Sequence, residues 1–194
     1  MSEQLSLTGF DAPAQPTDRL FFAILPPPDV AERIDHLAAQ LRQQHGLQGP
    51  PHKVGRFHIT LHHLGDYAGL PPDVIAAASR AAESVVWPPF DLTFDRAMSF
   101  SGHRSSRPFV LRGSDEGLKT LVQFQQALGL AMTKAGIGRL VDTRFTPHVT
   151  LLYDRSLVAD EAIEPIRWTA DQFVLVHSLL GQTRHIHLSN WTLR

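Results

Sequence analysis

The chain has 194 residues, of which 43% are hydrophobic and 19% charged, enough for one well-buried core and rather few for two large domains. With neutral histidines the formal net charge is −1, which excludes the broad electropositive surface of proteins that bind long nucleic acids. The chain has no cysteine, which excludes disulfides, thiolate zinc sites and a cysteine nucleophile. We expect a single compact domain in a reducing compartment, with any nucleic-acid partner short or bound locally.

The N-terminal segment predicts neither export nor a membrane anchor. Residues 1–18 are rich in polar residues and proline and lack a basic segment followed by an apolar one, so they predict a flexible tail rather than a secretory signal. No apolar run approaches the ~20 residues that a membrane span needs. We therefore expect a cytoplasmic monomer with one domain over residues 19–194, no membrane partner and no obligate protein partner.

The first part of the chain predicts a strand, a helix and a second strand. Residues 19–25 form a short apolar run that ends at three prolines, which is typical of a buried strand followed by a breaker. A helix should follow, with Asp29 as its cap, apolar residues at helical spacing and an end near Gly46. Residues 56–65 alternate with period two, which predicts a strand with one apolar and one polar face.

The rest of the chain continues this mixture of helices and strands. The pattern predicts a helix over 71–87, strands over 90–100 and 108–112, a helix over 115–135, and strands over 145–153, 173–180 and 185–193. Gly136 to Arg139 resembles a phosphate loop but lacks the Lys-Ser/Thr pair and a following helix, so we interpret it as a helix-ending turn.

Comparison of the two halves indicates a duplicated unit. Phe21 and Phe109 begin matching strand, helix and strand patterns, and the second strand of each unit carries a similar motif. The motif is His-Ile-Thr-Leu at 58–61 and His-Val-Thr-Leu at 148–151, with the two histidines 90 residues apart. A single His-x-Thr is weak evidence, but two at equivalent points of a repeat indicate a symmetric pair.

The paired motifs point to acid-base chemistry at a phosphate. On a strand, residues i and i+2 face the same side, so His58 projects with Thr60 and His148 with Thr150. One imidazole can take a proton from an attacking oxygen while the other protonates a leaving oxygen, and either ring suits either role near neutral pH. The threonine hydroxyls can donate hydrogen bonds to the phosphate oxygens. This chemistry requires no metal and no cofactor.

At these residues the sequence resembles the two-histidine phosphoesterases, and within them the RNA 2′,3′-cyclic phosphodiesterases once described as 2′-5′ RNA ligases. The resemblance runs from Arg19 to the C-terminus and rests on Phe-His-Ile-Thr-Leu-His-His-Leu-Gly at 57–65 and Phe-Thr-Pro-His-Val-Thr-Leu at 145–151. It implies a bilobal α+β fold in which two antiparallel sheets face a central cleft with helices outside. The implied activity is hydrolysis of a 2′,3′-cyclic phosphate at an RNA end or on a small nucleotide to a 2′-phosphate, with 2′-5′ ligation as a side activity.

By analogy with the family, His58 would protonate the leaving oxygen and His148 would activate water. A near-symmetric site can also work in the opposite direction, so this assignment stays open. His62 and His63 depart from the family pattern, which more often has an apolar or aromatic residue there.

Other polar residues near the motifs are weaker candidates. Arg144 and Arg56 each precede a motif and could bind phosphate. His62 falls on the same predicted face as His58, where it could line the cleft or bind a metal or substrate, and His63 falls on the opposite face.

Histidines and aromatic residues elsewhere have both structural and functional interpretations. His185 and His187 share one face of a strand, where solvated histidines are common, so a functional role is the less favoured interpretation. Phe57, Tyr153 and Trp168 could stack on a base, but aromatic residues in strands more often belong to the core.

Three other functions remain open at this stage. The cleft could bind a nucleotide or an RNA end without turnover. The enzyme could act on a small cyclic nucleotide or a 2′,5′-linked oligonucleotide. A metallohydrolase built on His58, His62 and His148 is a further alternative, but no Asp or Glu beside them completes a ligand set.

Overall fold

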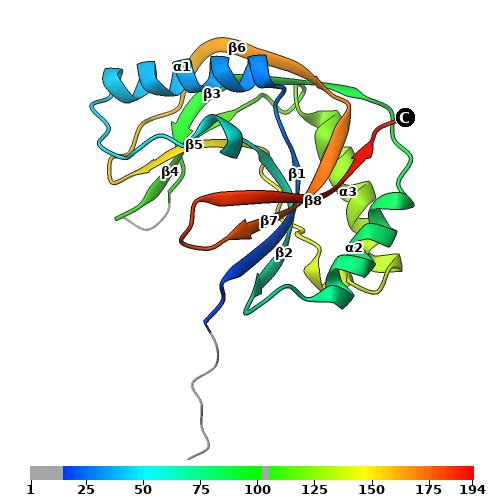
Figure 1. Ribbon diagram of the computed structural model, residues 1–194. Coiled ribbons are helices and arrows are strands. Elements are labelled where there is room, and N and C mark those ends of the chain that lie inside the picture. Colours follow the sequence, from blue (N-terminus) through cyan, green and yellow to red (C-terminus); the bar gives the residue numbers. More distant parts are fainter. Residues whose placement is uncertain (1–14, 102–104) are drawn as a thin grey trace, which may run out of the picture.

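The computed structural model describes residues 15–101 and 105–194 as two sheets with three helices (Figure 1). Residues 1–14 of the predicted tail lie outside this range, and the first strand already begins at Asp18. In chain order the elements, where η marks a short 3-10 helix, are β1 (Asp18–Ile24), α1 (Pro28–Gln44), η1 (Val54–Arg56), β2 (Ile59–Tyr67), α2 (Pro72–Glu83), β3 (Phe90–Ser99), β4 (Arg107–Arg112), α3 (Lys119–Lys134), η2 (Gly138–Leu140), β5 (Val149–Asp154), β6 (Glu161–Ala170), β7 (Gln172–Leu179) and β8 (Arg184–Thr192).

The strands form two four-stranded antiparallel sheets that confirm the predicted α+β class. One sheet has the order β2-β1-β7-β8 and the other β5-β4-β3-β6. The unit β1-α1-β2 corresponds to β4-α3-β5, because in each the two strands are neighbours in the sheet and the helix connects them. The internal repeat predicted from the sequence is therefore present in the fold.

The helices lie on the outer faces of the sheets. Although α1 follows β1, it packs against β5 and β6 of the other sheet, and in Figure 1 β6 passes over it. Helix α3 packs against α2 and also touches β2 and β3, one strand from each sheet. The crossover helices thus tie the two lobes together. Among the residues described, no helix is both long and apolar enough to cross a bilayer.

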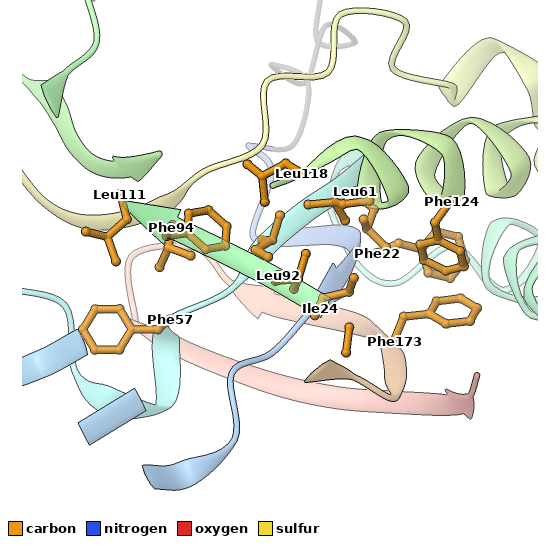
Figure 2. Close-up of a cluster of buried hydrophobic side chains, with 14 of the residues drawn as sticks. Phe22, Ile24, Phe57, Leu61, Leu92, Phe94, Leu111, Leu118, Phe124 and Phe173 are labelled. Atoms are coloured by element: carbon orange, nitrogen blue, oxygen red, sulfur yellow. The ribbon is translucent and has the colours of Figure 1, made fainter. Parts of the chain in front are cut away.

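One hydrophobic cluster runs through both lobes (Figure 2). Phe22 and Ile24 from the first sheet and Leu92 and Phe94 from the second are all fully buried in it. Phe124 of α3 lies against Phe173 of β7, with ring centroids 5.2 Å apart. Because this core is shared, the two motif-bearing strands are held in a fixed relation to each other.

The sequence pattern missed one strand and misplaced some helix ends. Strand β6 was not predicted because Pro165 interrupts it and its charged residues recur every third position, which breaks the period-two pattern of a strand. It is an edge strand, and the pairs Phe94–Ile166 and Arg96–Ala162 leave residues 163–165 opposite a single residue of β3, a bulge that accommodates the proline.

The predicted ends of the helices were less accurate than their predicted positions in the chain. Helix α3 begins at Lys119 rather than near residue 115, and α2 ends at Glu83, before the predicted residue 87. Asp29 does not cap α1: Pro27 is the cap residue and Pro28 opens the helix, as the fixed φ of proline favours. Gly136, with φ of 88°, ends α3, which confirms the predicted turn there.

Candidate active site

The same β-bulge follows both histidine motifs. In β2, Thr60 pairs with Ala23 and His62 with Phe22, so the residue between them has no partner. In β5, Thr150 pairs with Val110 and Leu152 with Phe109, which leaves an equivalent unpaired residue. A bulge of this kind reverses which residues of the following strand face each side of the sheet.

The bulge overturns the predicted orientations of two histidines. His62, expected on the face of His58, points into the core and is fully buried. His63, expected on the opposite face, lines the cleft instead. Tyr153 occupies the position in β5 that matches His63 in β2, and it too lines the cleft with 48% of its surface exposed.

His62 connects the first motif strand to the segment that leads into the second motif. Its Nε2 donates to the carbonyl of Gln125 at 2.9 Å, and its Nδ1 accepts from the backbone N–H of Asp142 at 3.1 Å. The Gln125 amide donates in turn to the carbonyl of Asp142 at 2.8 Å. Burial lowers the pKa of His62, which favours the neutral ring that this pattern requires.

These contacts engage both ring nitrogens of His62 with protein groups on the far side of the sheet from the cleft. The metal-ligand set of His58, His62 and His148 is therefore not formed. Within residues 15–101 and 105–194 there is also no group of three or more His, Asp or Glu side chains that could hold a metal ion.

The two motifs meet at a cavity of about 380 Å³ between the sheets. His58 and Thr60 line it from one lobe and His148 and Thr150 from the other, as the motif argument predicted. Arg144, the weaker candidate for phosphate binding, also reaches it. The other residues that line it are Arg19, Phe21, His52, Arg56, His63, Asp142, Phe145, Thr146, Tyr153, Ser178 and His185.

The two histidines are held in the same way. Each lies immediately before the first residue of its strand, and each places Nδ1 2.7 Å from the carbonyl oxygen two residues earlier, that of Arg56 for His58 and of Thr146 for His148. Because a carbonyl only accepts hydrogen bonds, Nδ1 carries a proton in both rings. Nε2 of each neutral ring is then an acceptor available to a substrate in the cavity.

An aromatic ring supports each imidazole. Phe21 lies against His58 with centroids 4.9 Å apart, and Phe100 lies edge-on to His148 at 5.1 Å. These contacts restrict the rotation of the imidazoles about their side-chain bonds. The hydrogen bond to Nδ1 and the neighbouring ring together fix where Nε2 points.

Both imidazoles favour the neutral form. Burial lowers the pKa of His58 to about 4, against the stabilising hydrogen bond from Nδ1 to the Arg56 carbonyl, and repulsion from His52, His148 and Arg56 contributes further. Burial, followed by repulsion from Arg112, also lowers the pKa of His148. The repulsion between the two histidines means that they titrate as a pair, in which one proton disfavours the second.

At one end of the cavity, the basic side chains are paired with a carboxylate. Arg19 donates from Nε and Nη2 to the two carboxylate oxygens of Asp66, both at 2.7 Å, and His63 Nε2 lies 3.0 Å from Asp66 Oδ1. Chiefly through Arg19, this network lowers the pKa of Asp66 to about 2. On another side, the Arg144 backbone N–H donates to Asp142 Oδ1 at 2.9 Å, which shapes the turn before the second motif.

Of the remaining sequence candidates, two lie in the core and one lines the cleft. Phe57 and Trp168 are core residues with 2% and 7% exposure, and Trp168 stacks on Phe94, as the structural interpretation predicted. His185 lines the cleft, in contrast to the favoured interpretation, whereas His187 is not among the cavity-lining residues.

Several cavity residues were missed by the sequence argument. Arg19 and Phe21 lie on β1, whose alternation with β2 could have revealed them once the two strands were paired. His52 and Ser178 carry no signal of their own, since they reach the cavity only through tertiary packing.

Comparison with known proteins identifies the family. The model of the 2′-5′ RNA ligase superfamily matches residues 26–182, which is most of the chain and includes both motifs. The chain belongs to the 2′-5′ RNA ligase superfamily. The resemblance to the two-histidine phosphoesterases seen in the sequence is thereby confirmed, and with it membership in a superfamily of phosphoesterases and ligases.

Solved structures of the superfamily have the same fold. E. coli LigT complexed with ATP is 27% identical, with a TM-score of 0.71 over 92% of this chain and 99% of that one. The same protein complexed with 3′-AMP gives 28% identity and a TM-score of 0.65 over the same shares of the chains. The protein TT0787 of Thermus thermophilus, at 24% identity and a TM-score of 0.68 over 91% of this chain and 98% of its own, shows the fold alone. No curated protein matches the sequence.

Proposed function

We propose that this protein hydrolyses the 2′,3′-cyclic phosphate at the end of an RNA to a 2′-phosphate, without a metal ion, by acid-base catalysis. The observation that carries the proposal is the matched pair His58 and His148. Each has Nδ1 committed to a carbonyl at 2.7 Å, and both line one cavity. Two imidazoles held in this way can act on opposite sides of one phosphorus atom.

In the proposed reaction, the oxygen of a water molecule attacks phosphorus while the bond from phosphorus to O3′ breaks. One histidine accepts the proton of the water at Nε2, and the other donates a proton from Nε2 to O3′. The products are a 2′-phosphate and a free 3′-hydroxyl, and the pair again holds one proton. His58 and His148 can exchange these roles if the substrate is turned around. Ligation to a 2′-5′ bond would follow the same course with a 5′-hydroxyl in place of water, so that P–O3′ breaks and a 2′-5′ diester remains.

The threonines complete the proposed site. Thr60 and Thr150 share the cavity face with the histidine two residues before each of them. Their hydroxyls would donate to the non-bridging oxygens, where negative charge is redistributed in the transition state. The Arg144 guanidinium would add a charged donor on the same side as His148.

Relatives of the chain support a nucleotide as the ligand. E. coli LigT has been crystallised in complexes with ATP and with 3′-AMP, so a protein of this fold binds nucleoside phosphates. Tyr153 and Phe145, which line the cavity, are aromatic faces on which a base could stack. We infer that RNA ends and small cyclic nucleotides are the partners of this cleft.

The test is a product-resolved assay with a dinucleotide that ends in a 2′,3′-cyclic phosphate, in water enriched in oxygen-18. We expect a 2′-phosphate as the only product, with one labelled oxygen, at a rate unchanged by EDTA. Phosphorus NMR separates the 2′- from the 3′-phosphate, and mass spectrometry counts the label.

Three results would contradict the proposal. A 3′-phosphate as the main product would show that the leaving oxygen is O2′ rather than O3′. Tight binding of the dinucleotide without any turnover would instead favour a non-catalytic RNA-end binding protein. Loss of the rate in EDTA, restored by a divalent metal, would point to metal-assisted hydrolysis.

A further inference from the structure

One wall of the cavity carries three basic side chains that the proposed reaction does not use. His52 precedes η1, Arg56 ends it, and His185 lies near the start of β8. The ring of His185 is edge-on to His58, with centroids 5.3 Å apart. We call His52, Arg56 and His185 the basic wall; it lies next to His58.

The segment that bears His52 is fixed in place by contacts with β5. The backbone N–H of His52 donates to the carbonyl of Leu151 at 2.8 Å. Just before it, the N–H groups of Gln48 and Gly49 both donate to one carboxylate oxygen of Asp154 at 2.7 Å. A side chain at Gly49 would collide with the carbonyl of Tyr153, so glycine permits this close approach. The basic wall is therefore preformed rather than assembled from a free loop.

The basic wall lacks the carboxylate partners found elsewhere in the cavity. Arg19 and His63 share Asp66, but across the described part of the chain no Asp or Glu is within 4.0 Å of the charged nitrogens of the basic wall. The Nε atom of Arg56 is buried and has no hydrogen-bond partner. A buried guanidinium N–H without an acceptor is costly, so a small shift of Arg56 that brings this N–H to an anion in the cavity would be favourable.

Repulsion within the basic wall points to the charge of that ligand. Burial lowers the pKa of His185 to about 3, and repulsion from His58, Arg56, His187 and His52 contributes to this shift. Burial and then repulsion from Arg56 lower the pKa of His52. An anion placed among these groups would reverse the repulsion and favour protonated, donating imidazoles.

We propose that His52, Arg56 and His185 form a second phosphate subsite, so that the preferred substrate carries another phosphate beside its cyclic phosphate. This inference rests on the proposed function where it concerns the reacting phosphate. Binding of a phosphate at the subsite does not depend on that function. Two sources can supply the further phosphate: a 5′-phosphate on the terminal nucleotide, or the diester that links this nucleotide to the preceding one. Either places a phosphate anion within one nucleotide of the reacting group.

The kinetic test compares three substrates: adenosine 2′,3′-cyclic phosphate, the same compound with a 5′-phosphate, and the ApA dinucleotide with a terminal cyclic phosphate. We expect kcat/KM to rise at least about tenfold on adding the second phosphate, the effect expected of one charge-assisted hydrogen bond. A gain with the 5′-phosphate alone identifies that source, and a gain with ApA alone identifies the diester. Equal values for all three would overturn the inference and leave the proposed function standing.

The variants His185→Gln and His52→Gln remove an imidazole on different elements while keeping a polar side chain of similar size. Each should reduce by about tenfold the ratio of kcat/KM between the substrate with a second phosphate and adenosine 2′,3′-cyclic phosphate, measured with whichever source of that phosphate gives the gain in the wild type. The matched control is His36→Gln on the exposed face of α1, which should leave this ratio at the wild-type value. A wild-type ratio in both cleft variants would contradict the proposal.

A binding measurement tests the subsite independently of the proposed reaction. Calorimetry with adenosine 2′-monophosphate and adenosine 2′,5′-bisphosphate measures the gain from the second phosphate without any turnover. We expect the bisphosphate to bind about tenfold more tightly, and the gain to be lost in His185→Gln. If no substrate is hydrolysed but this gain is present, the subsite stands and the proposed reaction does not. Equal affinities, together with no gain in kcat/KM for ApA, would refute the subsite even for an active enzyme.

Discussion

Each of the two central imidazoles is held by a hydrogen bond to its own chain. The carbonyl that accepts from Nδ1 lies two residues before the histidine in both motifs, so His58 and His148 share one tautomer by the same local contact. The motif His-x-Thr predicted which residues meet in the cleft. It could not predict that the pKa values of both rings are lowered, because the shifts depend on burial and on His52, Arg56 and Arg112.

A pH-rate profile tests the charge state of this pair. The active pair holds one proton, and both pKa values lie below the ordinary value of 6.5, that of His58 at about 4. As pH rises, the free enzyme loses the last proton of the pair, so kcat/KM should peak below pH 6.5 and decline toward higher pH. Initial rates corrected for uncatalysed hydrolysis measure this, with His36→Gln as a control for histidines outside the cleft. A flat profile from about pH 5 to 9 would contradict the shared proton.

At the scale of elements, the bulge after each motif determines which side chains reach the cleft. Period-two alternation placed Ile59, Leu61 and Thr60 correctly but failed at His62 and His63, because an unpaired residue reverses the faces of the strand beyond it. No glycine or proline marks this bulge, which falls at Leu61. Strand β6 escaped prediction for a similar reason, since an edge strand with a bulge tolerates Pro165.

The buried His62 provides a prediction at this scale. In His62→Leu the side-chain volume is kept, but the Asp142 N–H and the Gln125 carbonyl lose their partner. We expect the free energy of unfolding to fall by about 1–3 kcal/mol, the cost of unsatisfied buried polar groups. Urea unfolding measures this, and His36→Leu on the exposed face of α1 is the control.

The same variant should also affect the rate through the segment before the second motif. Asp142 accepts from the Arg144 backbone N–H, so loss of the His62 contact loosens the turn that presents Arg144. We expect KM to rise more than kcat falls, because His58 and His148 are untouched. Unchanged stability together with unchanged KM would show that the His62 network has no positioning role.

For the whole molecule, the duplicated architecture was predictable and the mode of lobe association was not. Two similar strand-helix-strand patterns with equivalent motifs predicted matched sheets around one cleft, and family resemblance supplied the bilobal α+β description. The position of α1 against β5 and β6 of the other sheet depends on side-chain packing over the shared core. Such long-range packing leaves no periodic signal in the sequence.

The histidines also give stability a defined pH dependence. Because their pKa values are lowered by folding, the unfolded chain binds more protons below about pH 6.5, so stability is lost as pH falls from that value toward the folded pKa values. Folding also lowers the pKa of several carboxylates. These groups affect stability only below pH 3.8, their ordinary pKa, where they reduce it further as pH falls. The histidines with lowered pKa values are His52, His58, His62, His148 and His185.

We therefore expect Tm to fall between about pH 7 and pH 5, and inorganic phosphate to raise Tm more at the lower pH. A phosphate in the cleft favours protonated imidazoles, which offsets the loss. Differential scanning calorimetry with chloride at matched ionic strength as the control measures both effects. A Tm that rises on acidification would contradict the lowered pKa values.

The most direct test of the central claim is the rate of 2′-phosphate formation by His58→Ala and His148→Ala, each shown to be folded by circular dichroism. If the two imidazoles act as acid and base on one cyclic phosphate, each variant should lose a factor of about 10² to 10⁴ in kcat while EDTA leaves the wild-type rate unchanged. A wild-type rate in either folded variant would contradict the account.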